Sequence, residues 1–205
     1  MTSDPVIHIV DDDRSVREAV QALLESVGLS ARTYGSTTEF LEARGWSGAG
    51  CLLLDVRLPG GSGLDFHARM AGLGVFLPVI FMTGHGDIPM SVQGMKGGAV
   101  DFLTKPFRDQ DLLDAVSTAL ERDRARRASD QGVEDLRTRY AGLSPREREV
   151  MRLVCSGKMN KQVAGDLEIS EVTVKIHRGA AMRKMGARTL PDLVRMADLL
   201  AASQD

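Results

Sequence analysis

Apolar runs alternate with helix-like stripes through the first 120 residues of the chain. Between the runs, apolar residues recur every three or four positions, as in residues 16–27, where Gly28 is the expected end of a helix. Alternating strands and helices predict a parallel sheet with helices on both faces. The runs that we interpret as strands are Val6–Val10, Ser30–Tyr34, Cys51–Leu54, Pro78–Met82 and Val100–Leu103.

The pattern changes after residue 120. Residues 121–139 hold 11 charged side chains and few large apolar ones, which predicts a solvated helical linker with Gly132 as the candidate hinge. From Leu143 onward the spacing predicts four compact helices, at about 145–156, 160–167, 171–185 and 190–201, and no strand. We therefore predict an α/β domain at 1–122, a linker at 123–141 and an all-α domain at 142–205.

Composition fits this division and adds a contrast in charge. Residues 1–120 hold 9 Lys/Arg and 15 Asp/Glu, a net charge of −6, whereas residues 140–205 hold 11 and 8, a net charge of +3. The acidic part suits a bound cation and the mildly basic part a polyanion. Two distant cysteines favour free thiols in a reducing compartment. No leader and no bilayer-spanning apolar run is evident, so we expect a cytoplasmic protein without membrane contact.

Polar residues follow the predicted strands at their carboxyl ends. Asp11 and Asp12 follow the first strand, Asp55 the third, Thr83 the fourth and Lys105 the fifth. In a doubly wound sheet of order 2-1-3-4-5 these ends meet in one crevice, which is where such sheets bind ligands. The sequence therefore predicts a ligand site built from three carboxylates, a hydroxyl and an ammonium group.

The chemistry of this set points to a phosphoryl group. Three neighbouring carboxylates repel one another unless a cation joins them, and oxygen ligands favour Mg²⁺. Lys105 and Thr83 suit an anionic group, and the Asp55 carboxylate is a candidate nucleophile that would form an aspartyl phosphate. The alternative for any one carboxylate is ordinary turn or cap chemistry, and Asp13 is the expected N-cap of the helix that follows.

Four segments carry a close resemblance to the receiver domain of bacterial two-component response regulators: IHIVDDD, LLLDVRLPGGSG, PVIFMTGHGDIPMSV and AVDFLTKPF. The resemblance covers residues 5 to about 122, and TGHGDIPM is similar to the FixJ subfamily. It implies that Asp55 accepts a phosphoryl group from a sensor histidine kinase. It also implies that Asp11 and Asp12 hold Mg²⁺ together with Asp55 and the backbone carbonyl of Arg57.

The same resemblance assigns the supporting residues. Thr83 would hydrogen-bond the phosphoryl group and Lys105 would pair with it, while Phe102 would be an aromatic switch that turns inward with Thr83. The Lys105–Pro106 peptide bond would be cis. His85 borders the crevice, and with Arg57 it is a candidate for setting the lifetime of the phosphoryl group. His8, His67 and His177 are interpreted as packing residues.

The third C-terminal helix, at 171–185, has an unusual outer face. Val174, Ala181 and Met185 share one narrow sector, while the opposite face joins apolar and basic residues. Such a face suits the major groove of DNA, where methyl groups contact thymine and basic groups reach guanine or phosphate. The alternative is a small helical bundle with ordinary surface charges. The outer face consists of Val172, Ile176, Gly179 and Arg183, flanked by Lys175 and Ala180.

The segments LSPREREV, NKQVA, EVTVKIHR and ARTLPDLVRMA look like a LuxR-type helix-turn-helix over residues 140–203. Ser144 and Glu147 form the expected capping box of its first helix. Two departures stand out: Glu168 replaces a common glycine in the turn, and the Ala180–Ala181 pair is small. The residues that we predict to contact DNA are Thr173, Lys175, Ile176, Arg178, Gly179 and Arg183.

Together these features predict a phosphorylation-controlled transcriptional regulator rather than an enzyme, with at most self-phosphorylation and dephosphorylation. Phosphorylation would favour a homodimer through the fourth helix, fifth strand and fifth helix, and the dimer would bind double-stranded promoter DNA, with RNA polymerase as a further candidate partner. One rival is a Mg²⁺-dependent hydrolase with Asp55 as nucleophile. Phosphatases of the haloacid dehalogenase type carry a second Asp where this chain has Arg57. A second rival is a DNA-binding protein whose receiver serves only packing.

Overall fold

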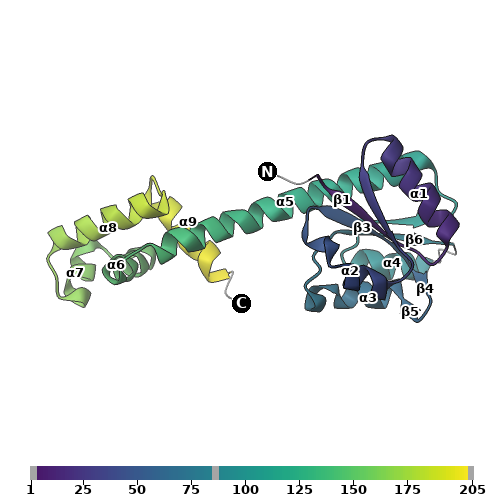
Figure 1. Ribbon diagram of the computed structural model, residues 1–205. Helices are drawn as coiled ribbons and strands as arrows, with labels where there is room; N and C mark the ends of the chain where they lie inside the picture. Colours follow the sequence, from purple (N-terminus) through teal and green to yellow (C-terminus); the bar gives the residue numbers. More distant parts are fainter. Residues whose placement is uncertain (1–3, 85–87, 203–205) are drawn as a thin grey trace. The chain divides into compact units, whose positions relative to one another are not determined.

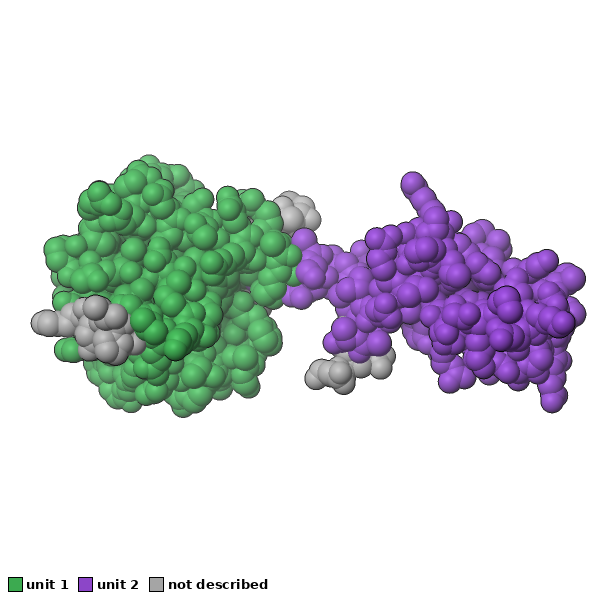
Figure 2. All heavy atoms as spheres, turned by 180° about the vertical axis from the view of Figure 1, so that it is seen from behind, with its two compact units in different colours: residues 1–126 green, residues 127–205 purple. Residues whose placement is uncertain are grey.

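The computed structural model describes residues 4–84 and 88–202. The chain divides into two compact units, Met1–Arg126 and Arg127–Asp205, which Figure 2 colours separately. Each unit has its own hydrophobic core. Within the described residues, no helix has the length and apolar character needed to cross a membrane.

The first unit is built on a parallel sheet of five strands in the order β2-β1-β3-β6-β7. Counted along the chain, this is the predicted order 2-1-3-4-5, so the doubly wound fold is confirmed. Every neighbouring pair in the sheet is parallel. The strands are β1 (Val6–Val10), β2 (Ser30–Tyr34), β3 (Gly50–Asp55), β6 (Val79–Thr83) and β7 (Asp101–Thr104).

Helices cover both faces of the sheet, with α1 and α5 on one face and α2, α3 and α4 on the other (Figure 1). Because successive strand residues point to opposite faces, Leu53 of β3 joins the core under α1 and α5, while Leu54 joins the other core. The helices are α1 (Arg14–Ser26), α2 (Thr37–Ala43), α3 (Gly63–Met70), α4 (Ile88–Lys96) and α5 (Asp109–Ala141), with short 3-10 turns at Gly45–Ser47 and Ala71–Leu73.

Two predicted histidine roles are confirmed in the first unit. His8 on β1 is buried, and its Nδ1 lies 3.1 Å from the hydroxyl oxygen of Tyr34. Burial lowers the pKa of His8 to about 4, so the ring is neutral near pH 7. His67 packs its ring edge-on against Phe81. His85 lies outside the described residues.

The segment after β3 contains a small hairpin that the sequence reading missed. β4 (Arg57–Leu58) pairs antiparallel with β5 (Gly61–Ser62). Gly60 turns the chain between them with a φ of 90°. Strands of two residues carry no periodic signal, so the sequence pattern does not predict them.

The expected break at Gly132 is absent. α5 continues as one helix from Asp109 to Ala141, through Gly132, so the predicted linker is helical without a hinge at that residue. A single glycine in a helix interior costs only about 1 kcal/mol relative to alanine, which neighbouring helix formers offset.

The second unit holds the four predicted helices, α6 (Pro145–Cys155), α7 (Asn160–Leu167), α8 (Glu171–Met185) and α9 (Leu190–Ala202). The capping box of α6 is present, because Ser144 Oγ accepts from the Glu147 N–H and the Glu147 carboxylate accepts from the Ser144 N–H. Lys184 also donates to Glu147 at 2.7 Å, and this contact lowers the pKa of the carboxyl.

Glu168 ends α7 in the left-handed region, with a φ of 53°. Glu168→Gly is expected to raise the free energy of unfolding of the second unit by about 0.5–1 kcal/mol, because glycine lacks the Cβ that makes this conformation costly. Urea denaturation measures the change. The matched control is Lys161→Gly, an exposed position in the first turn of α7, which should lower the stability by up to about 1 kcal/mol. Equal losses at both positions would contradict strain at Glu168.

Candidate functional site

The carboxyl edge of the sheet brings the three predicted carboxylates together. Asp11 directly follows β1 and is fully buried, Asp55 is the last residue of β3 and is 6% exposed, and Asp12 is exposed. One oxygen from each of the three side chains lies within 4.8 Å of the others. The predicted cluster therefore forms, with two carboxylates inside the crevice and one at its mouth.

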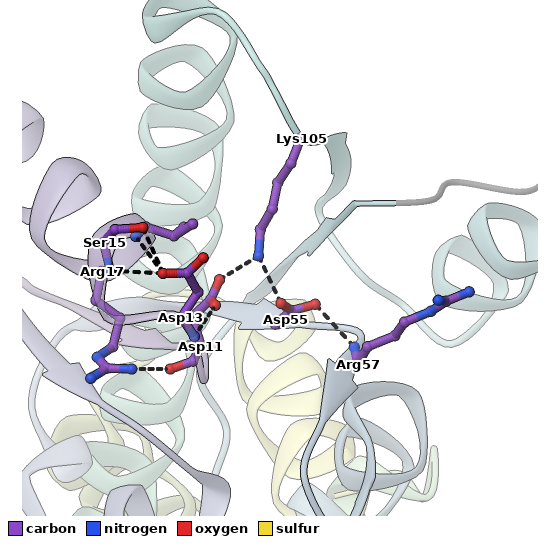
Figure 3. A network of polar contacts seen from close by, with 8 residues as sticks. Asp11, Asp13, Ser15, Arg17, Asp55, Arg57 and Lys105 are labelled. Carbon is purple, nitrogen blue, oxygen red and sulfur yellow. Dashed lines mark hydrogen bonds and ion pairs between the residues drawn. The ribbon is translucent and has the colours of Figure 1, made fainter.

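Backbone and helix contacts orient Asp11. The Asp13 N–H donates to Asp11 Oδ1 at 3.0 Å, and Arg17 Nη1 donates to the Asp11 carbonyl oxygen at 2.6 Å (Figure 3). Asp13 itself caps α1, as predicted, by accepting from the N–H of Ser15 at 2.8 Å. Arg17 was not identified from the sequence, although its position one turn after the cap places it beside the loop.

The hairpin after β3 orients Asp55. The Arg57 N–H donates to Asp55 Oδ1 at 3.0 Å, and the Arg57 side chain points away from the crevice (Figure 3). A Cβ at Gly63 would lie 2.2 Å from the Asp55 carbonyl oxygen, so only glycine lets α3 begin this close to the end of β3. Gly63 is thus a site residue that the sequence alone does not reveal. The Arg57 carbonyl as a metal ligand stays a prediction.

Lys105 reaches into the cluster from the loop after β7. Its Nζ lies 2.5 Å from Asp11 Oδ2 and 2.7 Å from Asp55 Oδ2, so one ammonium bridges both buried carboxylates (Figure 3). The Lys105 N–H also donates to the Thr83 carbonyl at 2.7 Å, and the Lys105–Pro106 bond is cis, as the resemblance implied. The predicted meeting of these strand ends is confirmed.

The pKa values of Asp11 and Lys105 are both raised, so both groups hold their protons more tightly than usual. Burial alone lowers the pKa of the Lys105 ammonium, but its hydrogen bonds to Asp11 and Asp55 outweigh burial and raise that pKa. Burial raises the pKa of the Asp11 carboxyl, against the opposing effect of Lys105. Both directions follow from a crevice in which two buried carboxylates share one ammonium, so a proton or a further cation is favoured there.

The residues present fit a divalent cation. All three side chains offer carboxylate oxygens, which are the hard ligands that Mg²⁺ prefers. Asp12 lies at the exposed mouth, where a bound cation would keep part of its water shell. The cluster has the composition of a magnesium site that binds through few carboxylates and leaves room for phosphate oxygens.

Thr83 and Phe102 lie on the adjacent strands β6 and β7. Thr83, the last residue of β6, is fully buried and pairs in register with Thr104 of β7. Phe102 on β7 is half-buried, with its ring centre 5.9 Å from that of Phe81. This arrangement puts both predicted switch residues at the β6–β7 edge, and their movement stays a prediction.

The predicted faces of α8 are present in the second unit. Val174, Ala181 and Met185 are fully buried, so the small Ala181 still belongs to the core. Val172 is 66% and Ile176 is 63% exposed, which is unusual for two large apolar side chains one turn apart. The outer face therefore offers an apolar surface that a partner would cover.

The residues predicted to contact DNA differ in how free their side chains are. Lys175, Ile176 and Arg183 are exposed, whereas Thr173, Arg178 and Gly179 are half-buried. Thr173 Oγ1 lies 2.8 Å from Ser170 Oγ in the cap of α8, and Arg178 Nη1 donates to Asn160 Oδ1 of α7 at 3.3 Å. Thr173 therefore also stabilises the start of α8, and Arg178 also joins α8 to α7.

Comparison with known families identifies both units. Residues 7–117 match the response regulator receiver domain, and residues 141–197 match the bacterial regulatory proteins of the luxR family. The chain belongs to the response regulators that join a receiver domain to a LuxR-type DNA-binding domain. It is a phosphorylation-controlled, DNA-binding transcriptional regulator, and its receiver implies a sensor kinase as partner.

Relatives and solved structures agree with this assignment. The chain is 54% identical to "Nodulation protein W" of Bradyrhizobium diazoefficiens, over 97% of this chain and 87% of that protein. It is 44% identical to the transcriptional regulatory protein FixJ of Azorhizobium caulinodans, over 93% and 90%. The solved response regulator StyR superposes with a TM-score of 0.81 at 42% identity, covering 96% of this chain and 99% of that one.

Proposed function

We propose that Asp55 is the phospho-acceptor, within a receiver at residues 1–122. The observation that carries the proposal is the bridge from Lys105 Nζ to Asp11 and Asp55, which gathers one ammonium and two buried carboxylates at a single sheet edge. The linker then spans residues 123–141 and the DNA-binding domain residues 142–205. We assign Mg²⁺ to Asp11, Asp12 and Asp55, with the Arg57 carbonyl as a further ligand.

The reaction transfers a phosphoryl group from a phosphohistidine of the kinase. An Asp55 oxygen attacks phosphorus, the bond between the histidine nitrogen and phosphorus breaks, and the nitrogen keeps the electron pair. Mg²⁺, when bound, neutralises charge on the phosphoryl oxygens. Lys105 moves from Asp55 to pair with the product, and the Thr83 hydroxyl donates to it. Lys105 and Thr83 thus position the phosphoryl group and neutralise its negative charge. Positioning and charge neutralisation account for most of the catalysis of phosphoryl transfer.

The proposed chemistry stops at self-phosphorylation and dephosphorylation. A hydrolase of the haloacid dehalogenase type would need a general acid two residues after its nucleophile. Arg57 stands there, and its exposed guanidinium points away from Asp55 (Figure 3). A guanidinium remains protonated at any relevant pH and is a poor general acid. Arg57 and His85 remain candidates for setting the lifetime of the phosphoryl group.

Phosphorylation is proposed to favour a homodimer through α4, β7 and α5. Val92 and Met95 on α4 are nearly half exposed, which supports an apolar contact there. Thr83 and Phe102 would couple the phosphoryl group to this face. The dimer would bind a two-fold promoter site in the cytoplasm, and RNA polymerase is a further proposed partner.

DNA contact is proposed through the outer face of α8. Lys175 and Arg183 would reach bases or phosphates, and Ile176 would contact a thymine methyl group. Thr173 and Arg178 would contribute while also fixing the position of the helix. Gly179 would let the helix backbone approach the groove closely.

Gly179→Ala is expected to change the stability of the DNA-binding domain and its affinity for DNA in opposite directions. A Cβ there would lie 3.5 Å from Arg183 Nη1, an ordinary contact, so alanine fits the free domain and should raise its free energy of unfolding by about 1 kcal/mol. A methyl group facing DNA should weaken binding about tenfold, equivalent to about 1.4 kcal/mol. Gly132→Ala in α5, which meets open space, is the control that gains stability without losing affinity. Unchanged DNA affinity in Gly179→Ala would remove Gly179 from the interface.

The function itself is tested by footprinting genomic fragments with the full chain, before and after treatment with a small phosphodonor and Mg²⁺. Phosphorylation should double the mass seen by light scattering and protect two half-sites about one helical turn apart. Stoichiometric phosphorylation that leaves both mass and footprint unchanged would instead support a receiver that serves only packing.

A further inference from the structure

A buried carboxylate on α5 contacts the end of β3 opposite to Asp55. Asp123 is 1% exposed, and its Oδ2 accepts from the N–H of Gly50, the first residue of β3, at 3.1 Å. Its Oδ1 accepts from Arg126 Nη2 at 2.7 Å. The contact joins residues 73 positions apart, so it ties α5 to the strand that carries the phospho-acceptor at its other end.

The position of Asp123 on α5 is one where an apolar residue would be expected. The buried residues of the helix follow a stripe at helical spacing, and Asp123 is the last of them. A charge at the end of an apolar stripe costs free energy unless it is hydrogen-bonded and paired, as it is here. The apolar part of this stripe consists of Leu112, Ala115, Val116 and Ala119.

The contact with Asp123 also depends on the lack of a side chain at Gly50. It has a φ of 158°, and a Cβ there would lie 2.0 Å from the Val6 carbonyl oxygen of β1. Any other residue would push β3 away from β1 and carry its N–H away from Asp123. The hydrogen bond from the Gly50 N–H to Asp123 therefore depends on glycine at this position.

β3 connects Asp55, at one end of the strand, to the Gly50–Asp123 hydrogen bond at the other end. All six of its residues, Gly50–Asp55, are buried, and the strand pairs with β1 on one side and β6 on the other. A packed strand transmits displacement because the interior leaves no space to absorb it. α5 continues beyond Arg126 to Ala141, so its later turns belong to the second unit.

We propose that Asp123 is a positioning residue that couples the phospho-acceptor strand to the linker part of α5. A change at Asp55 shifts β3, and the Gly50–Asp123 hydrogen bond carries that shift to the helix that leads into the DNA-binding domain. The switch residues Thr83 and Phe102 would transmit phosphorylation through β6 and β7. The Gly50–Asp123 contact would transmit it separately, through the end of β3 opposite to Asp55. The proposal rests on the phosphorylation of Asp55 proposed above.

The test uses the full chain, with Asp123→Ala, Asp123→Asn and the control Glu121→Ala, which removes an exposed carboxylate from the same helix. The Gly50 amide resonance is followed by NMR before and after phosphorylation. DNA affinity is measured in both states, and labelling at Asp55 is measured for every variant. Alanine removes the acceptor for the Gly50 N–H, while asparagine keeps an acceptor of the same shape.

In the parent chain, phosphorylation should shift the Gly50 amide resonance. Asp123→Ala should be labelled normally but should reduce the phosphorylation-dependent gain in DNA affinity to less than about 2-fold, from the range of about 5- to 150-fold typical of coupled sites. Asp123→Asn should keep part of the gain, and Glu121→Ala all of it.

Two results would overturn the coupling role of Asp123. One is a Gly50 resonance in the parent chain that stays in place after stoichiometric phosphorylation, a readout that does not depend on how any variant folds. The other is a full gain in DNA affinity in folded Asp123→Ala. Failure to label Asp55 in the parent chain would instead overturn the proposed phospho-acceptor, so the two failures are distinguishable.

Discussion

Asp55→Asn is expected to abolish covalent labelling by acetyl phosphate and Mg²⁺ and, with it, the phosphorylation-dependent gain in DNA affinity. An amide oxygen lacks the charge that makes a carboxylate a nucleophile. The fold should persist, because the amide oxygen can still accept from the Arg57 N–H, and Lys105 keeps its partner Asp11. Intact-protein mass measures the added phosphoryl group.

The control for this variant is Asp65→Asn, which neutralises an exposed carboxylate in the first turn of α3. It should be labelled like the parent chain. Undiminished labelling of Asp55→Asn would show that another residue accepts the phosphoryl group. Circular dichroism and thermal unfolding of both variants separate a chemical effect from loss of structure.

Gly63→Ala is expected to lower the free energy of unfolding of the receiver by about 1–3 kcal/mol and to slow labelling at Asp55. The added methyl group would lie 2.2 Å from the Asp55 carbonyl oxygen, which is backbone and cannot rotate away. Either α3 or the end of β3 must move, and both hold the acceptor in place. Urea denaturation and the labelling rate are the two measurements.

Gly61→Ala is the matched control, because Gly61 lies in β5, two residues before Gly63, and its Cβ would meet open space. It should unfold and label like the parent chain. Equal behaviour of the two alanine variants would argue against close packing at Gly63. A loss in Gly63→Ala alone would show that the requirement for glycine lies at Gly63, beside Asp55, and not in the segment as a whole.

Much of the fold was predictable from local patterns. Buried strands appear as continuous apolar runs, and the amphipathic helices between them repeat every three to four residues. The residues of the candidate site could be found for the same reason, because Asp11 and Lys105 directly follow strands and Asp55 ends one. Parallel strands bring such positions to one edge whatever their separation in sequence.

Other features depend on contacts between distant backbones. Gly63 belongs to the site because the Asp55 carbonyl oxygen lies beside it. Arg17 belongs to the site because its guanidinium donates to the Asp11 carbonyl oxygen. Asp123 looks like one more charge in a charged linker, yet it is buried against Gly50. No local pattern distinguishes these residues from surface neighbours.

The sequence by itself determined the two-domain plan, the strand order, the polar groups of the acidic crevice and the outer face of α8. The domain plan and the helix face follow from hydrophobic periodicity, which is a local property. The strand order follows from requiring the polar residues at the strand ends to meet in one crevice, as they do in a doubly wound sheet. The tertiary structure alone decided that α5 passes unbroken through Gly132, that one ammonium bridges two carboxylates, and that Asp123 joins β3. These depend on distances between segments far apart in the chain, which only packing sets.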